Sequence, residues 1–264
     1  MRNINFADLD KGYQDTPPQL IGMYPLGGGG LIEAPYRHYF ELRHLTKIIN
    51  FNKKMSMLEL GCGNGRWAVS LAPRVAHYTG IDVTPRALEI ARDSVNALNI
   101  GNATFHEMSI LDFKGDRPYD FIYFSSVSQY LDDQQIHQIM NNLARWIKTS
   151  TIIVDRSTLN YDGRQILERP DYYSILRTSN ELDHIFQAHG FSLAYYKRSY
   201  RFLRGARFLT LSPLNRLLPS IIQRTQPVSL YIMLFFSWLA DTIKPKPNPF
   251  DDCGSSHDFL LFKQ

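Results

Sequence analysis

An apolar segment that ends in a glycine-rich turn constrains this sequence most. Residues 57–60 read Met-Leu-Glu-Leu, residues 61–65 read Gly-Cys-Gly-Asn-Gly, and a helical pattern starts at Arg66. This order predicts a buried parallel strand, a tight loop and the first turn of a helix. Glycine permits positive φ and lets a ligand approach the backbone, and the first N–H groups of the helix offer donors. The stretch therefore predicts a nucleotide-type binding site.

The spacing of the glycines separates the classes of nucleotide site. A dinucleotide fingerprint has glycine at its first, third and sixth positions, which are here Gly61, Gly63 and Arg66. A P-loop ends in Gly-Lys-Ser/Thr, and this turn does not. The pattern Glu59-x-Gly-x-Gly-x-Gly65 instead resembles the first motif of class I S-adenosylmethionine-dependent methyltransferases. The resemblance implies S-adenosylmethionine as the cofactor.

The rest of the chain follows the element order of that family. Helical patterns alternate with apolar segments, which predict further strands at 77–83, 103–108, 119–125, 151–157, 192–196 and 257–262. The resemblance implies an α/β fold with a doubly wound, seven-stranded, mostly parallel sheet and an antiparallel last strand. We expect four parts: an N-terminal helical lid over 1–56, the cofactor-binding core over 57–201, an insertion over 202–256 and the last strand over 257–264.

Residues that the resemblance assigns to the cofactor follow the first four strands. Asp82 ends the second strand about twenty residues beyond the turn, where an acid accepts the ribose hydroxyls. The family usually has Asp after the third strand; here Ser109 stands there, so backbone groups are expected to contact the adenine. The predicted cofactor-binding residues are Glu59, Gly61, Cys62, Gly63, Gly65, Asp82, Val83, Ser109, Ile110 and Ser125.

Acceptor and catalytic residues are expected at the carboxyl ends of the later strands, where ligands bind in open α/β sheets. Asp155 ends an apolar strand and is either a general base or an ion-pair partner of Arg156. The predicted catalytic residues are Asp155, Arg156 and Tyr161, and the predicted substrate-binding residues are Tyr36, Arg37, Gln129, Tyr130, Tyr173 and Arg177. His184 and His189, on a predicted helix, are interpreted as surface or core-edge residues.

Composition narrows the functional class. The 264 residues are 44% hydrophobic and include two cysteines, which make neither a disulfide framework nor a metal set and favour a reducing compartment. The N-terminus has no apolar core of signal-peptide length, so we expect a cytoplasmic protein. Neither Asn/Asp-Pro-Pro-Tyr/Phe after the fourth strand nor a Pro-Cys nucleophile occurs, which disfavours nucleic acid as the acceptor.

We therefore predict O-methylation of a small molecule or saccharide, with a lipid-linked acceptor included. A catalytically silent cofactor-binding interaction protein and an RNA or protein methyltransferase remain the alternatives. Intact Glu59, Asp82 and the three glycines favour retained cofactor binding. A co-purified methylated glycan, lipid or metabolite would identify the acceptor.

The insertion at 202–256 has three interpretations, one of which is that it encloses the substrate. A stretch from Lys197 to Arg224 is basic and has no acidic residue, and the apolar run at 228–240 is shorter than the roughly twenty residues of a membrane span. A buried helical cap or a homodimer interface is the second reading. The third is a basic and apolar surface that lies on an anionic membrane, peripheral to it.

Overall fold

The computed structural model describes residues 30–169, 172–198 and 257–264. Its strands are β1 Ser56–Leu60, β2 His77–Asp82, β3 Ala103–Glu107, β4 Tyr119–Ser125, β5 Ile147–Thr158, β6 Gln165–Arg169, β7 Tyr172–Leu176, β8 Ser192–Arg198 and β9 His257–Lys263. Its α-helices are α2 Gly30–Ile48, α3 Arg66–Leu71, α4 Pro85–Ala97, α5 Asp133–Leu143 and α6 Ser179–Gln187. Single 3₁₀ turns are η2 Ala72–Arg74, η3 Ile110–Asp112, η4 Ser128–Tyr130 and η5 Ala144–Trp146.

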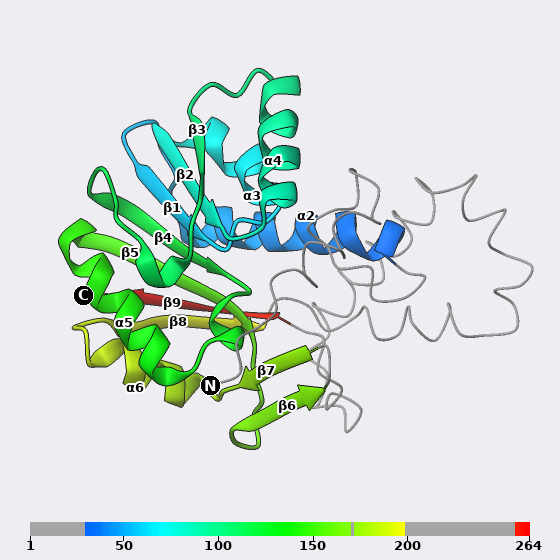
Figure 1. Ribbon diagram of the computed structural model, residues 1–264. Helices are drawn as coiled ribbons and strands as arrows, with labels where there is room; N and C mark the ends of the chain where they lie inside the picture. Colours follow the sequence, from blue (N-terminus) through cyan, green and yellow to red (C-terminus); the bar gives the residue numbers. More distant parts are fainter. Residues whose placement is uncertain (1–29, 170–171, 199–256) are drawn as a thin grey trace, which may run out of the picture. The chain divides into compact units, whose positions relative to one another are not determined.

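Seven strands form one sheet in the order β3-β2-β1-β4-β5-β9-β8 (Figure 1). Strands β1 to β5 pair in parallel, and β9 runs antiparallel to β5. The doubly wound, mostly parallel sheet with an antiparallel last strand is confirmed. The strand order reverses between β1 and β4, which is the topological switch point where open α/β sheets bind ligands.

Helices α5 and α6 cover one face of this sheet, and α3 and α4 cover the other (Figure 1). On the first face Phe186 of α6 stacks on Phe262 of β9 at 4.2 Å between ring centroids and meets Phe124 of β4 edge-on. On the second face the ring of Trp67 in α3 meets the ring of Tyr123 edge-on. Because β1 and β4 are buried on both faces, they read as apolar runs without alternation.

Capping residues begin two of the core helices as their sequences predict. Asp132 accepts the N–H of Gln135 at 2.8 Å and Thr178 accepts the N–H of Glu181 at 3.2 Å. Both helices also carry the reciprocal bond of a capping box. The cap at Asp132 begins α5 directly after the exit loop of β4, and the cap at Thr178 begins α6 directly after Arg177.

A two-stranded sheet of β6 and β7 lies between β5 and α6 along the chain. It was not predicted, because the polar residues of Gln165–Arg169 hide the alternation of a strand. The last residue of β7, Leu176, directly precedes Arg177. The hairpin therefore positions Arg177 against the loop that follows β4.

Residues 50–197, where described, and 257–264 form one compact unit; α2 with Ile49 belongs to a second unit. The helix expected in the N-terminal segment is present as α2, and its role as a lid stays a prediction. The insertion at 202–256 and its boundaries lie outside the described residues. Among the helices that the structure describes, none has the length and apolar character needed to cross a bilayer.

Candidate active site

The turn after β1 is built from three glycines in the left-handed region. Gly61, Gly63 and Gly65 have φ of 72°, 52° and 77°, values that residues with a Cβ rarely adopt. The N–H groups of Gly61 and Cys62 both donate to the carbonyl of Ile81 at 2.9 Å. This shared acceptor ties the turn to the end of β2.

Two of these glycines also permit close approach between elements. A Cβ on Gly61 would lie 3.2 Å from the side chain of Val127, which follows β4. A Cβ on Gly65 would lie 2.8 Å from the Cβ of Ala91 on α4, closer than carbon atoms pack. The glycine pattern therefore serves the packing of the turn as well as its backbone conformation.

The carboxylate of Asp82 joins the turns that follow β1 and β2. It accepts the N–H of Gly63 at 2.8 Å on one oxygen and the N–H of Thr84 at 2.9 Å on the other. Burial raises the pKa of Asp82, and the backbone hydrogen bonds oppose that rise. The side chain of Thr84 and the backbone of Val83 also hydrogen-bond to this carboxylate and lower its pKa.

Glu59 lies one strand away, inside the sheet. Its side chain is 1% exposed and accepts the hydroxyl of Tyr78. Burial raises the pKa of Glu59 to about 8, although hydrogen bonds from Tyr78 and Ser125 and the charge of Arg66 lower it. The carboxyl group is therefore held largely protonated at neutral pH in the protein without ligand.

The other predicted cofactor residues lie around this junction. The Cys62 thiol is buried over Gly80, since a Cβ there would be 2.9 Å from its sulfur, and burial raises the pKa of the thiol. Val83 links Asp82 to Thr84. Ser109 caps the turn after β3 by accepting the N–H of Leu111, and Ile110 is buried beside it.

The exit from β4 is tied to β5. Ser126 has φ of 61°, a strained value for a residue other than glycine. Its N–H donates to the carbonyl of Arg156 at 2.8 Å, and its hydroxyl accepts from the Arg156 guanidinium. Gln129 accepts the N–H of Thr158 at 3.0 Å through its side chain and is buried. This predicted acceptor residue therefore holds the two strand ends together.

Asp155 lies in a buried chain of hydroxyl groups. It accepts the hydroxyl of Ser157, whose oxygen is also hydrogen-bonded to that of Ser128. Burial raises the pKa of Asp155 to about 6, while the two serines and the charges of Arg177 and Arg156 lower it. Because neighbouring residues of a strand point to opposite faces, Asp155 and Arg156 are not brought to one side of the sheet.

Arg177 is 1% exposed and braces the loop between β4 and α5. Its guanidinium donates to the carbonyls of Ser128 at 3.0 Å and Leu131 at 2.6 Å, and to the carboxylate of Asp133 at 2.7 Å. Arg164 of the preceding loop binds the same carboxylate through two nitrogens at 2.7 and 3.0 Å. Whether Arg177 contacts a substrate stays a prediction; the contacts present are structural.

The remaining predicted residues are spread over the same edge. Tyr161, 44% exposed, donates to the carboxylate of Asp258 at the start of β9. Tyr130 is partly buried in η4, and Tyr173 is partly buried in β7. Side chains of Tyr36 and Arg37 lie outside the described residues. His184 is exposed, and His189 is partly buried with its Nε2 2.8 Å from Nδ1 of His137.

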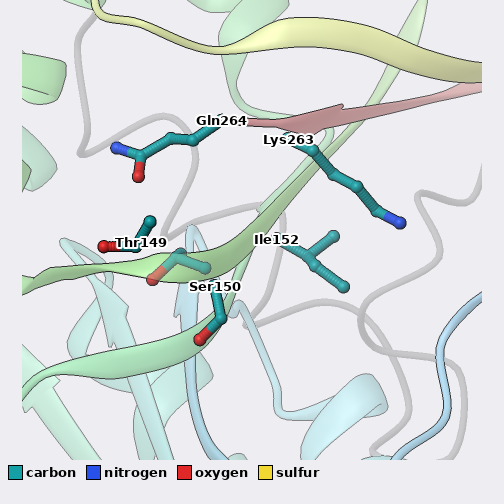
Figure 2. Close-up of a pocket in the computed structure, with 6 residues that line it drawn as sticks. Thr149, Ser150, Ile152, Lys263 and Gln264 are labelled. Carbon is teal, nitrogen blue, oxygen red and sulfur yellow. The ribbon is translucent and has the colours of Figure 1, made fainter.

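A pocket near the other end of β5 is unrelated to this site. It is lined by Thr149, Ser150, Thr151, Ile152, Lys263 and Gln264 (Figure 2). Its volume of about 190 Å³ is below the roughly 300 Å³ at which ligand pockets begin. Since β5 runs parallel to β1, its first residues lie at the edge of the sheet opposite to the glycine turn.

Comparison with known proteins agrees with this geometry. A family model described as a methyltransferase domain matches residues 57–150, which contain the glycine turn, Asp82 and β4. Residues 57–150 are therefore identified as a methyltransferase domain, and the sheet has the fold of class I, S-adenosylmethionine-dependent methyltransferases. S-adenosylmethionine is the cofactor of that domain.

The chain resembles a curated relative and many solved structures at low identity. A ubiquinone biosynthesis O-methyltransferase of Nitrosomonas europaea is 26% identical over 129 residues, which are 48% of this chain and 53% of that protein. The chain thus spans about half the length of this relative. A Leishmania major S-adenosylmethionine-dependent methyltransferase superposes with a TM-score of 0.60 at 12% identity, over 98% of this chain and 82% of that one. Magnesium protoporphyrin IX methyltransferase of Synechocystis, solved with bound S-adenosylmethionine, gives a TM-score of 0.54 at 15% identity, over 74% and 85%.

The groups around the turn fit this cofactor. S-adenosylmethionine presents hydroxyl and ammonium donors and a positive sulfonium, which require acceptors and negative charge. The methyltransferase domain offers the carboxyl groups of Asp82 and Glu59, together with the side-chain oxygen of Asn64. That oxygen is buried and has no hydrogen-bond partner among the described residues. Asn64 was not predicted as a site residue, although its place between two of the glycines was a signal for it.

Replacing Asp82 by Ala should weaken S-adenosylmethionine binding by about 1–3 kcal/mol, because charge-assisted hydrogen bonds are lost. Titration calorimetry with the cofactor measures this change. Asp93→Ala, an exposed change on α4, is the matched control and should bind normally. Unchanged binding by Asp82→Ala, or tighter binding of NAD than of S-adenosylmethionine by the natural protein, would contradict the assignment.

Replacing Glu59 by Gln should flatten the pH dependence of stability. The native carboxyl holds its proton up to about pH 8, whereas the unfolded one releases it near 4.5, so the free energy of unfolding should fall as pH rises through that window. Gln keeps the neutral form and removes on the order of 3 kcal/mol of this fall between pH 5 and 8. Urea unfolding at several pH values tests this, and an unchanged slope in the variant would refute it.

Proposed function

We propose that this methyltransferase acts on a hydroxyl oxygen of a small-molecule acceptor. The bound cofactor would supply an electrophilic methyl group on a sulfonium. Such a transfer depends mainly on how the acceptor is positioned, and a hydroxyl acceptor also has to lose a proton. The observation that carries the proposal is the junction of Gly63, Asp82 and Thr84 at the carboxyl ends of β1 and β2, with buried hydroxyl and carboxyl groups after β4 and β5 across the switch point.

In this proposal the residues that follow each strand have a separate role. Asp82 holds the ribose hydroxyls, and the backbone at Ser109 and Ile110 contacts the adenine. The loop after β4 forms the wall between cofactor and acceptor, since Val127 packs on Gly61. Asp155 is ionised above about pH 6 and can receive a proton through the hydroxyls of Ser157 and Ser128. Arg177 and Asp133 act by keeping that loop in place.

Relatives support oxygen as the methylated atom. The relative from Nitrosomonas europaea is named as an O-methyltransferase. It matches this chain over the cofactor half, so its acceptor does not transfer with the match. A saccharide or a lipid-linked molecule remains our finer proposal for the acceptor, with the protein cytoplasmic and peripheral to a membrane. The insertion at 202–256 serves in this proposal as the membrane surface, with a cap or homodimer interface as its alternative.

An acceptor screen tests the activity. Release of S-adenosylhomocysteine from a library of phenols, saccharides and lipid-linked sugars should identify a substrate, and amines, RNA and peptides should be inert. Gly63→Val should abolish cofactor binding and turnover, because a β-branched residue is strained at its φ of 52°. Gly101→Val, where a Cβ would meet nothing within 4 Å, is the matched control. Cofactor binding without turnover of any acceptor would favour the silent interaction protein.

Co-sedimentation with liposomes tests the membrane proposal. Each Lys or Arg near an anionic leaflet contributes about 1 kcal/mol, so the chain should pellet with anionic vesicles at low salt. Because salt screens this attraction, high salt should release it. Failure to pellet at low salt, or pelleting that salt leaves unchanged, would favour the cap or dimer interface.

A further inference from the structure

A carboxylate that receives two tyrosine hydroxyls lies beside the carboxyl end of β5. Asp258 is paired with Ser157 in the antiparallel register of β9 and β5. Tyr161, three residues beyond the end of β5, donates to one oxygen of Asp258, and the hydroxyl of Tyr196 on β8 donates to the same oxygen at 3.0 Å. Paired residues of an antiparallel ladder share a face, so Asp258 lies on the face that also carries Asp155 and Ser157.

The donor and acceptor roles in this cluster follow from its chemistry. An ionised carboxylate only accepts, and each phenol has a single proton to donate. Both hydroxyls lie within hydrogen-bond distance of Asp258, and Tyr161 is also hydrogen-bonded to Tyr196. Because the two protons are held within this cluster, the phenol oxygens act as acceptors toward a further group. Burial and the neighbouring Asp258 raise the pKa of Tyr161, so its proton stays on this bond. The cluster therefore matches a ligand group that donates.

Exposure of the three side chains sets the direction of approach. Asp258 is fully buried, whereas Tyr161 and Tyr196 are 44% and 37% exposed. A ligand would meet the tyrosines first, while the carboxylate behind them fixes the orientation of both hydroxyls. Two oriented phenol oxygens at one place form a more selective feature than a single exposed tyrosine.

We propose that Tyr161, Tyr196 and Asp258 form the binding site for the hydroxyl group of the methyl acceptor. Tyr161 and Tyr196 accept its O–H, and Asp258 is the positioning residue that orients them. This inference rests on the proposed function, because it places the acceptor over β5 and β9, next to the cofactor strands. Such a site should prefer acceptors with a free hydroxyl over their methyl ethers, which are also the products of the proposed reaction.

Binding of phenol and of its methyl ether, anisole, tests the site without turnover. Saturation-transfer NMR with S-adenosylhomocysteine bound should detect phenol and give anisole a weaker signal. The double variant Tyr161→Phe/Tyr196→Phe and the variant Asp258→Asn should each lose this preference, with phenol affinity reduced about tenfold by the lost hydrogen bonds. Tyr195→Phe, the neighbouring exposed tyrosine on β8, is the matched control and should keep it.

Calorimetry with S-adenosylhomocysteine and thermal unfolding accompany each variant, so that a collapsed fold is recognised. Tyr161→Phe alone keeps the ring and serves if the double variant or Asp258→Asn does not fold. Equal binding of phenol and anisole by the natural protein, or an undiminished preference in folded variants, would overturn the site. Selective phenol binding without any substrate in the acceptor screen would instead overturn the proposed function alone.

Discussion

The carboxylate of Asp82 holds together the part of this fold on which the site depends. It accepts N–H groups from Gly63 and Thr84, so the turns after β1 and β2 keep one relative position. Two N–H groups of the turn after β1, those of Gly61 and Cys62, also donate to the carbonyl of Ile81 in β2. A left-handed turn of three glycines has little side-chain packing of its own, and these hydrogen bonds supply the order that it lacks. Because charge-assisted bonds to backbone N–H groups are stronger than neutral ones, the acid serves the structure before any ligand arrives.

Burial raises the pKa of three carboxyl groups at or near the carboxyl edge of the sheet: Glu59, Asp82 and Asp155. They differ in what opposes the rise. Asp82 has backbone N–H groups, Asp155 has two serine hydroxyls, and Glu59 has hydrogen bonds from Tyr78 and Ser125 and the charge of Arg66. A cation that binds near Glu59 would favour its charged form and release a proton. In Glu59 and Asp82 burial favours the neutral carboxyl, and a positively charged ligand would favour the ionised one.

Local patterns predicted the features that depend on local chemistry. Short sequence patterns of fewer than eight residues predicted three such features, and the structure confirms them. They are the strand before Gly61, the position of Asp82 at the end of β2 and the capping box at Thr178. The β6–β7 hairpin and the burial of Arg177 depend on contacts between distant segments. Arg177 meets Asp133 forty-four positions away, and no period or motif signals that pairing. Strand β5 begins at Ile147 and not at the predicted residue 151. The polar residues 148–150 hide the apolar pattern at its start.

The proposed acceptor site and the predicted cofactor site differ in how far apart their residues lie in the sequence. The predicted cofactor contacts come from backbone groups and from residues within or close to the glycine motif and the end of β2, which short motifs can encode. Around β5 and β9 the polar groups come from residues that are remote in sequence: Ser128, Asp155, Tyr161, Tyr196 and Asp258. Their proximity exists only because β9 returns antiparallel beside β5 and sets Asp258 opposite Ser157. A change in that register by one residue would turn Asp258 to the other face of the sheet. The acceptor site that we propose therefore depends on sheet topology, and residues can change there without disturbing the cofactor motif.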